Sequence, residues 1–412
     1  MIREPNKNDW LTIIQLVFSV VAILGFWALA LALLVFGIFS PVDFQGGNLE
    51  KLSLYIFAAG SAAVGLLVVP SAVYSFNRIS GRDIAVGFPD RWWLRPTILI
   101  LALPAVLLLG HLAARQGSFG LLLLPFFHIL AVGLPVLWFL YLGVRGLPLG
   151  SQQRRWGVFD SGLVLGPIMI MLVEVILLVV MILVIGLFLI NHPDLLKELF
   201  RDIEGLVNSN ADPDQIITEL RPYLLNPAVI FLVFLFAALL VPLVEEALKP
   251  VGVWLLINRG ISPAEGFTAG LISGAGYAFF ESLALTSAAE EWMMVVVARI
   301  GTAVIHILTA GLMGWAMVYS WRYSSYLRLG FTYLGVVCLH GLWNGLTLLM
   351  VLAFIIEESN PVSEIYFGVP AIGGLAPFLL GMLSLTAFLA LLWVNRYLSK
   401  VYREEGSPGG AL

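Results

Sequence analysis

Ten apolar segments, each long enough to cross a lipid bilayer, follow one another along this chain. A membrane-spanning helix needs about 20 predominantly apolar residues to cover a hydrocarbon core of about 30 Å. The segments cover residues 11–39, 53–74, 94–112, 119–142, 159–190, 228–257, 264–286, 293–319, 329–354 and 370–393. The sequence therefore predicts an all-α fold, a polytopic transmembrane helical bundle of about ten membrane-spanning helices.

The composition agrees with a multi-pass protein of the cell membrane. Hydrophobic residues make up 60% of the chain and charged residues 12%, whereas a soluble domain carries about 25% charged residues. A formal net charge of -4 is small for 412 residues and indicates no nucleic-acid partner. The single cysteine, Cys338, excludes an intramolecular disulfide.

The positive charges between the segments predict the orientation in the membrane. If the N-terminus is cytoplasmic, the inner connections hold 15 Lys and Arg residues and the outer connections hold five, three of these in one long loop. Cytoplasmic connections of membrane proteins carry an excess of Lys and Arg. We therefore expect both termini to face the cytoplasm.

The long outer connection divides the chain into unequal parts. We predict N-terminal transmembrane helices without catalytic motifs over 1–190 and an extracytoplasmic amphipathic helical loop over 191–227. A catalytic transmembrane core over 228–354, a final loop and transmembrane helix over 355–395 and a cytoplasmic tail over 396–412 complete the chain. Apolar residues at helical spacing in 191–227 predict an interfacial helical hairpin, either a plain connector or a lid or docking surface for a substrate.

Polar residues in the core begin with a charged group on the segment 228–257. A charged side chain at the centre of a bilayer costs about 2.5–3.5 kcal/mol, so such residues indicate function. Lys249 lies three and four residues after Glu246 and Glu245 and can neutralise either carboxylate on the same helix face. Pro242 and Pro250 flank the group, and each favours a kink that admits water.

The next segment, 264–286, carries Glu281 after a glycine-rich approach. Its small residues allow close helix packing, and they are Gly266, Gly270, Gly274 and Gly276. Tyr277 lies one turn before Glu281, so its phenol could hydrogen-bond the carboxylate. At these limits Glu281 lies about 25 Å along its helix from the cytoplasmic end. It would meet Glu245 and Glu246 only if a helix boundary differs or the helix breaks at Pro242.

Two further segments supply histidines. His306 lies seven residues after Arg299 on the same helix face, and Asn344 lies one turn after His340. Together with Glu281, the two histidines are ligands of the kind that hold a catalytic zinc ion and leave a fourth position for water. Glu245 or Glu246 fits the role of general base, and Asn344 or Arg299 could stabilise an oxyanion or anchor a substrate.

The ordered set resembles the PrsW family of intramembrane proteases, related to the CAAX prenyl protease and bacteriocin-immunity (Abi) superfamily. The motifs are Glu-Glu-x-x-Lys, an aromatic residue four before a glutamate, a histidine helix and a second histidine helix, over about 228–350. By position, Glu245, Glu246, Lys249, Glu281, His306 and His340 match the family residues. Tyr277, Ser282 and Asn344 depart from it, since the family more often has Phe, Asn and Asp there.

The resemblance implies a membrane-embedded peptidase that cuts a membrane protein, in some members an anti-sigma factor during stress signalling. Zinc is the favoured cofactor. In the wider superfamily a glutamate-activated water without metal is the alternative, with the histidines and Asn344 stabilising the oxyanion. Either mechanism uses the same residues.

Two other functions fit buried charges in a membrane protein. A transporter or ion pathway more often has duplicated halves, and the first five segments contain no counterpart of these motifs. A catalytically silent membrane scaffold or immunity protein would keep the motif set without turnover, so only an activity measurement separates it from a protease.

Overall fold

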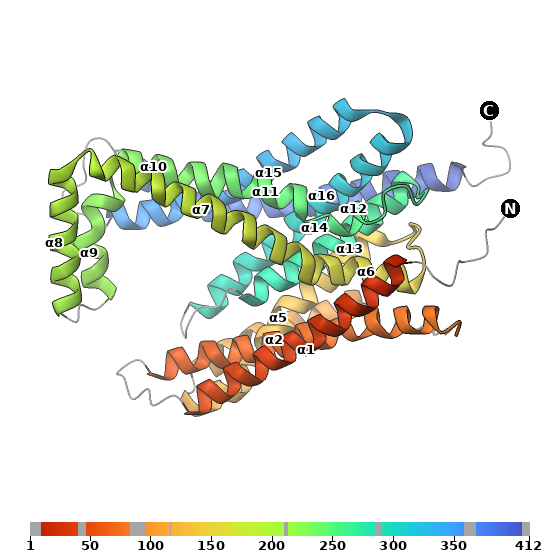
Figure 1. Ribbon diagram of the computed structural model, residues 1–412, viewed down its shortest axis with the longest axis horizontal. Coiled ribbons are helices and arrows are strands. Elements are labelled where there is room, and N and C mark those ends of the chain that lie inside the picture. The colour runs from red at the N-terminus through yellow and green to blue at the C-terminus, as the bar shows by residue number, and fades with distance from the viewer. Residues whose placement is uncertain are drawn as a thin grey trace. The chain divides into compact units, whose positions relative to one another are not determined.

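The computed structural model describes residues 10–39, 47–82, 96–115, 117–209, 213–284, 291–357 and 368–405. This part of the chain contains helices and no strands (Figure 1). The all-α prediction is therefore confirmed.

Nine of the described helical stretches are long and apolar enough to cross a membrane. They are Trp10–Phe39, Lys51–Ile79, Pro96–Ala114, Gly120–Val144, Gln152–Ile190, Pro227–Trp254, Trp292–Tyr323, Tyr326–Ile356 and Val369–Glu404. Each corresponds to one predicted segment, so the chain is a multi-pass membrane protein. The tenth predicted segment, 264–286, forms the helix α13 (Pro263–Ala284), whose glycines and polar residues make it less apolar than the others.

The chain folds into two compact units. The first unit comprises residues 1–168, 246–336 and 384–412, and the second comprises 169–245 and 337–383. The divisions fall inside four helices: α7 (Gly166–Ile190), α11 (Val241–Leu248), α15 (Tyr326–Glu357) and α16 (Val369–Glu405). Each unit is therefore assembled from segments far apart in the sequence.

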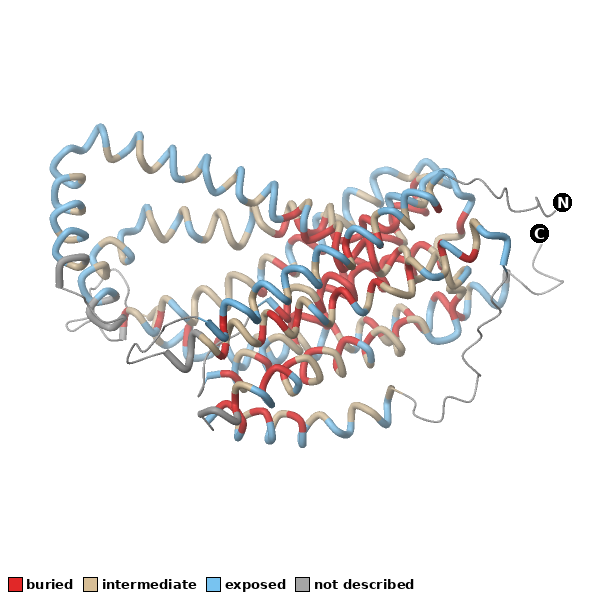
Figure 2. Tube along the Cα trace, turned by 60° about the horizontal axis from the view of Figure 1, so that its bottom comes forward, coloured by how far each residue is buried: buried red, intermediate tan, exposed pale blue. Residues whose placement is uncertain are grey.

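In the first unit, α1 (Trp10–Phe39) packs along α2 (Gly47–Ile79), and α13 packs against α14 (Trp292–Tyr323), α5 (Gly117–Val144) and α6 (Gln152–Asp160). Of the 22 residues of α13, 17 are buried, and Figure 2 colours such residues red. A Cβ added at Gly266, Gly270 or Gly274 would lie under 3.0 Å from a backbone oxygen of α14. The glycine-rich helix is therefore central to its unit, as predicted.

The predicted segment 228–257 is not one continuous α-helix. It consists of α10 (Pro227–Phe234), a π-helix η3 (Leu235–Leu240), α11 and the short α12 (Val251–Trp254). A turn at Lys249–Pro250 separates α11 from α12, because Pro250 has no N–H to continue the helix. Ser273 of α13 donates a hydrogen bond of 2.6 Å to the Lys249 carbonyl oxygen at this break. Pro242 lies in the first turn of α11, directly after η3, so its missing N–H leaves a carbonyl of the preceding turn without a helical partner.

In the second unit, α8 (Pro193–Ser209) and α9 (Pro213–Leu224) form the predicted helical hairpin, and Figure 1 shows them side by side. The Tyr223 hydroxyl of α9 donates a hydrogen bond of 2.8 Å to Asp202 of α8. Apolar side chains of both helices are exposed, among them Phe200 and Ile203. That the hairpin is extracytoplasmic stays a prediction.

Near the C-terminus, α16 continues through Glu405, so the first part of the predicted tail 396–412 is helical. Residues 406–412, and residues 358–367 of the predicted final loop, lie outside the described residues.

Candidate active site

A buried ion pair on α11 and the following turn begins the site in the first unit. Lys249 Nζ lies 2.8 Å from Glu246 Oε1, and both side chains are 0% exposed. The three-residue spacing places the two groups on one helix face, as predicted. Lys249 Nζ also lies 2.7 Å from Nδ1 of the buried His306 on α14. The lysine therefore connects a carboxylate to an imidazole.

The other side of the His306 ring faces Glu281 of α13. His306 Nε2 and Arg299 Nη2 each lie 2.6 Å from Glu281 Oε2. Arg299 Nε donates a hydrogen bond of 3.2 Å to Ser282 Oγ. The seven-residue spacing of Arg299 and His306 thus directs both side chains to one carboxylate, which confirms that they share a helix face.

These contacts indicate the protonation state of His306. A lysine ammonium has three donors and no acceptor, so Nδ1 must accept the hydrogen bond from Lys249. Nε2 then carries the ring proton and faces Glu281 Oε2 at 2.6 Å, which describes a neutral imidazole. The neutral ring of His306 lies between two ion pairs. One pair is Glu246 with Lys249, and the other is Glu281 with Arg299, so the charges of the group balance.

The aromatic ring of Tyr277 packs on this group. It lies edge-on to His306, with 5.3 Å between ring centroids, and Lys249 Nζ lies 5.0 Å from its centroid. Both contacts use the aromatic ring, which tyrosine and phenylalanine share. A tyrosine in place of the family's more frequent phenylalanine therefore preserves them.

The second unit contributes Glu245 of α11 and His340 of α15, both buried. Glu245 Oε2 lies 3.9 Å from His340 Nδ1. Gly341 allows this approach, because an added Cβ would lie within 3.0 Å of the carbonyl oxygen of Ala238 in η3. The paired glutamates of the sequence motif therefore have different histidine neighbours.

Asn344 Nδ2 donates a hydrogen bond of 2.8 Å to the carbonyl oxygen of Ala237 in η3. A π-helix widens the turn and leaves backbone carbonyls without their usual α-helical partners. Asn344 satisfies one of these carbonyls, a role for which the amide has a donor and a carboxylate has none. Its predicted roles beside His340 or an oxyanion stay predictions.

The structure brings the predicted site residues together within each unit. The first unit groups Glu246, Lys249, Glu281, Arg299 and His306, and the second groups Glu245, His340 and Asn344. The break at Lys249–Pro250 allows Lys249 and His306 to connect Glu246 with Glu281, which removes the predicted separation along the helices. Sequence reasoning missed Ser282 as an acceptor for Arg299 and Ser273 as the donor at the helix break.

The residue types fit a zinc ion. Glu245, His306 and His340 are buried, and each offers a ligand atom of the kind that metals bind. Two ligand atoms on a tetrahedral zinc lie about 3.3 Å apart. His306 Nε2 and Glu281 Oε2 are at hydrogen-bond distance, 2.6 Å. Shared ligation by these two atoms would therefore require loss of the ring proton and a shift of less than about 1 Å.

Comparison with known families gives one match, which covers the predicted site residues. Residues 216–375 match the family model of the PrsW family intramembrane metalloproteases. This range contains η3, all eight predicted site residues and the start of α16. No curated protein and no solved structure matches the chain.

Proposed function

Residues 216–375 form a PrsW family intramembrane metalloprotease domain, and on this premise we propose that both residue groups belong to one peptidase active site. The family makes the chain a membrane peptidase, which implies a lipid bilayer and protein substrates. The charge-balanced contacts of the buried Lys249 and His306 with the partly exposed Glu281 carry the proposal, because apolar helices rarely contain such groups without a function.

The chain itself supports a single site. Glu245 and Glu246 are consecutive residues of α11, and consecutive Cα atoms lie about 3.8 Å apart. One glutamate lies near His340 and the other near Lys249, which in turn contacts His306. Two groups of catalytic residue types that meet at adjacent residues are best explained as parts of one centre.

We assign Glu245, His306 and His340 as the metal ligands. A bound zinc ion would supply a water with a pKa near 7 and a Lewis acid for the scissile carbonyl. The Glu245 side chain is 8% exposed, as suits a ligand, whereas the Glu281 side chain is 27% exposed. A general base must exchange protons with water, so Glu281 takes that role. The ligand set predicted from sequence, with Glu281 in place of Glu245, is the alternative.

The remaining residues position these groups. Arg299 holds one oxygen of Glu281 and so fixes the direction in which the carboxylate accepts a proton. Lys249 neutralises the charge of Glu246 and contacts Nδ1 of His306, so that metal binding would use Nε2 after loss of its proton. Asn344 stabilises the π-helical turn next to α11.

The proposed substrate comes from the family resemblance, and the proposed orientation comes from the charge distribution of the sequence. We propose a single-span membrane protein, such as an anti-sigma factor, as the substrate, and regulatory proteolysis during stress as the setting. The distribution of Lys and Arg supports a protein of the cell membrane with cytoplasmic N- and C-termini.

The first experiment measures zinc per chain in detergent-purified protein. Wild type is expected to hold about one zinc, and the double variant His306→Ala/His340→Ala none. Glu281→Gln is expected to keep the metal if Glu281 is the base, and to lose it if Glu281 is a ligand. Glu174→Gln, which changes an intramembrane glutamate of α7 outside the site, is the matched control and should keep the metal.

The same variants are then tested for cleavage of reconstituted single-span membrane peptides. Glu281→Gln should reduce the rate by at least about a hundredfold, the usual contribution of a general base, and Glu174→Gln should not. Absence of zinc from correctly folded wild-type protein would refute the metal site. Cleavage by wild type without zinc would then establish the glutamate-only mechanism, and absence of cleavage would favour a silent scaffold.

A further inference from the structure

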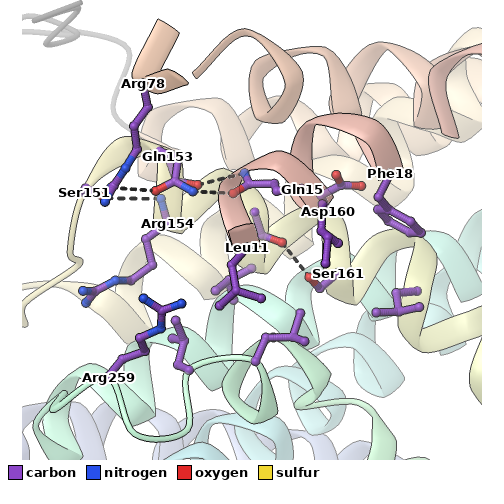
Figure 3. A pocket seen from close by; sticks show the side chains of 17 residues that line it. Leu11, Gln15, Phe18, Arg78, Ser151, Gln153, Arg154, Asp160, Ser161 and Arg259 are labelled. Atoms are coloured by element: carbon purple, nitrogen blue, oxygen red, sulfur yellow. Dashed lines mark hydrogen bonds between the residues drawn. The ribbon is translucent and has the colours of Figure 1, made fainter. Parts of the chain in front are cut away.

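A cavity of about 470 Å³ lies in the first unit and includes none of the residues assigned to proteolysis. Residues of α1, α6, the π-helix η2 (Ser161–Leu165), α12 and the ends of neighbouring segments line it (Figure 3). Both the cavity and the contacts described next belong to the first unit, so they do not depend on how the two units are arranged.

One side of the cavity is rich in positive charge. Arg78, Arg154 and Arg259 line it, and Figure 3 shows all three on the same side of the view. Arg154 forms an ion pair of 2.9 Å with Glu265. Arg78 donates a hydrogen bond of 3.0 Å to the neutral amide of Gln153, so that contact leaves its charge uncompensated. This side of the cavity therefore favours an anion.

All three arginines belong to connections that the sequence places on the cytoplasmic side. Inner leaflets carry anionic lipids, and Lys and Arg residues near that surface attract their phosphate groups. A phosphate diester is thus the anion that a cavity in this position most readily meets.

A carboxylate with an unused acceptor lies in the same cavity. Asp160 is 1% exposed, and its Oδ2 accepts a hydrogen bond of 2.6 Å from Ser19. Its Oδ1 is buried and accepts no hydrogen bond of normal geometry among the described residues, and the Ser71 hydroxyl faces the same carboxyl group. Buried polar atoms are nearly always satisfied, so the ligand should carry an O–H or N–H donor as well as an anion.

Apolar side chains form a large part of the remaining lining. They are Leu11, Ile14, Phe18, Leu165, Leu255 and Leu256. An inorganic anion would gain nothing from these side chains, whereas an acyl chain would bury apolar surface against them.

We propose that this cavity binds one molecule of a phosphatidylglycerol-type lipid. Its phosphate contacts the arginines, a headgroup hydroxyl donates to Asp160, and an acyl chain covers the leucines and Phe18. Phosphatidylglycerol combines the three required features, a single negative charge, hydroxyl donors and acyl chains, in one molecule.

Native mass spectrometry of the detergent-released full chain tests the proposal. With equal amounts of phosphatidylglycerol and phosphatidylcholine, wild type is expected to retain one phosphatidylglycerol per chain in preference. Arg78→Gln/Arg259→Gln should weaken this retention about 30-fold, because each arginine near an anionic surface contributes a factor of about five and the two factors multiply. Arg322, which lines a neighbouring cavity and not this one, is the position of the matched control, and Arg322→Gln should bind as wild type does.

Further variants and competitors separate the possible ligands. If the double variant does not fold, Arg259→Gln alone serves as the test. It leaves the Arg78–Gln153 contact in place and should lower retention about fivefold. Asp160→Asn should reduce the preference for phosphatidylglycerol over a lipid phosphate without hydroxyls. Equal retention of both lipids by wild type, displacement of the lipid by free inorganic phosphate, or unchanged binding by the arginine variants would overturn the proposal.

Discussion

At the scale of single residues, Lys249 has the most demanding position. Its ammonium group is fully buried between Glu246 and His306. Burying two charges costs several kcal/mol per ion, and their attraction offsets this cost only when the geometry is good. A buried ion pair of this kind therefore need not add to the stability of the fold. Its hydrogen bond to His306 gives the pair a functional reason, since it fixes which ring nitrogen carries the proton.

Replacement of Lys249 by methionine should therefore damage both folding and function. Lys249→Met leaves the Glu246 charge buried without its cation and is expected to destabilise the protein by about 3–5 kcal/mol. Glu246→Gln/Lys249→Met removes both charges and should recover most of that loss but not the cleavage rate. Chemical denaturation measures the first effect, with the exposed Lys400→Met as control. Equal stability of the single and double variants would contradict a paired role.

The sequence predicted which residues belong to the site because their spacing follows helical geometry. Lys249 with Glu246 and Arg299 with His306 share helix faces whatever the tertiary structure is. It did not predict which glutamate lies near which histidine. That depends on the turn at Lys249–Pro250 and on the close approach of Gly341 to Ala238, and neither follows from spacing along one helix.

At the scale of helices, two glycines one turn apart on α15 differ in a useful way. A Cβ added at Gly341 would lie under 3.0 Å from the Ala238 carbonyl oxygen, whereas one added at Gly345 would meet the Ala238 side chain at an ordinary 3.8 Å. Close helix packing in the second unit therefore depends on the first glycine and not on the second.

We expect Gly341→Ala to separate α15 from η3, at a cost of about 1–3 kcal/mol. The adjacent His340 would move away from Glu245, so zinc content and cleavage should fall together. Gly345→Ala, with the same added methyl group, should behave as wild type in both assays. Similar zinc contents for the two variants would show that the close contact at Gly341 does not position His340.

The hairpin of α8 and α9 has a pH-dependent contact. Partial burial, followed by the hydrogen bond to Asp202 and the charge of Asp202, raises the pKa of Tyr223 to about 12. A raised pKa means that folding favours the protonated phenol. The contact therefore stabilises the hairpin fully below the ordinary tyrosine pKa of about 10 and is lost as the pH rises through about 12.

The tyrosinate absorbance of wild type minus that of Tyr223→Phe should show one phenol that titrates near pH 12. Asp202→Asn removes the acceptor charge and should lower that midpoint toward about 10. A midpoint near 10 in wild type would show that the two helices do not hold this contact in solution.

Helix identity was easier to predict than helix continuity. The apolar segments gave nine of the spans, because length and hydropathy decide whether a stretch can cross a bilayer. The π-helical turns η2 and η3 could not be predicted, since one extra residue in a turn leaves the apolar pattern of a fully apolar segment unchanged. Both turns lie where another helix approaches closely, at Gly162 and at Ala238.

At the scale of the whole molecule, the metal is expected to stabilise the fold as well as the reaction. A ligand that binds only the folded state adds about 4 kcal/mol when its concentration is a thousandfold above its dissociation constant. Chelation should therefore lower the unfolding temperature and abolish cleavage, and added zinc should restore both. His306→Ala/His340→Ala should show no response to chelation. If the unfolding temperature of wild type is the same with and without chelator, a tightly bound metal is contradicted.

The position of His340 has a consequence for the newly made protein. Its neighbour Glu245 is synthesised several helices earlier, and His340 enters the chain only with α15, the last helix but one of the described part. During translation, the glutamates and His306 are already in the membrane while the second histidine is still missing. With the proposed ligand set, the protein cannot cut its neighbours at the site of insertion until α15 has been synthesised.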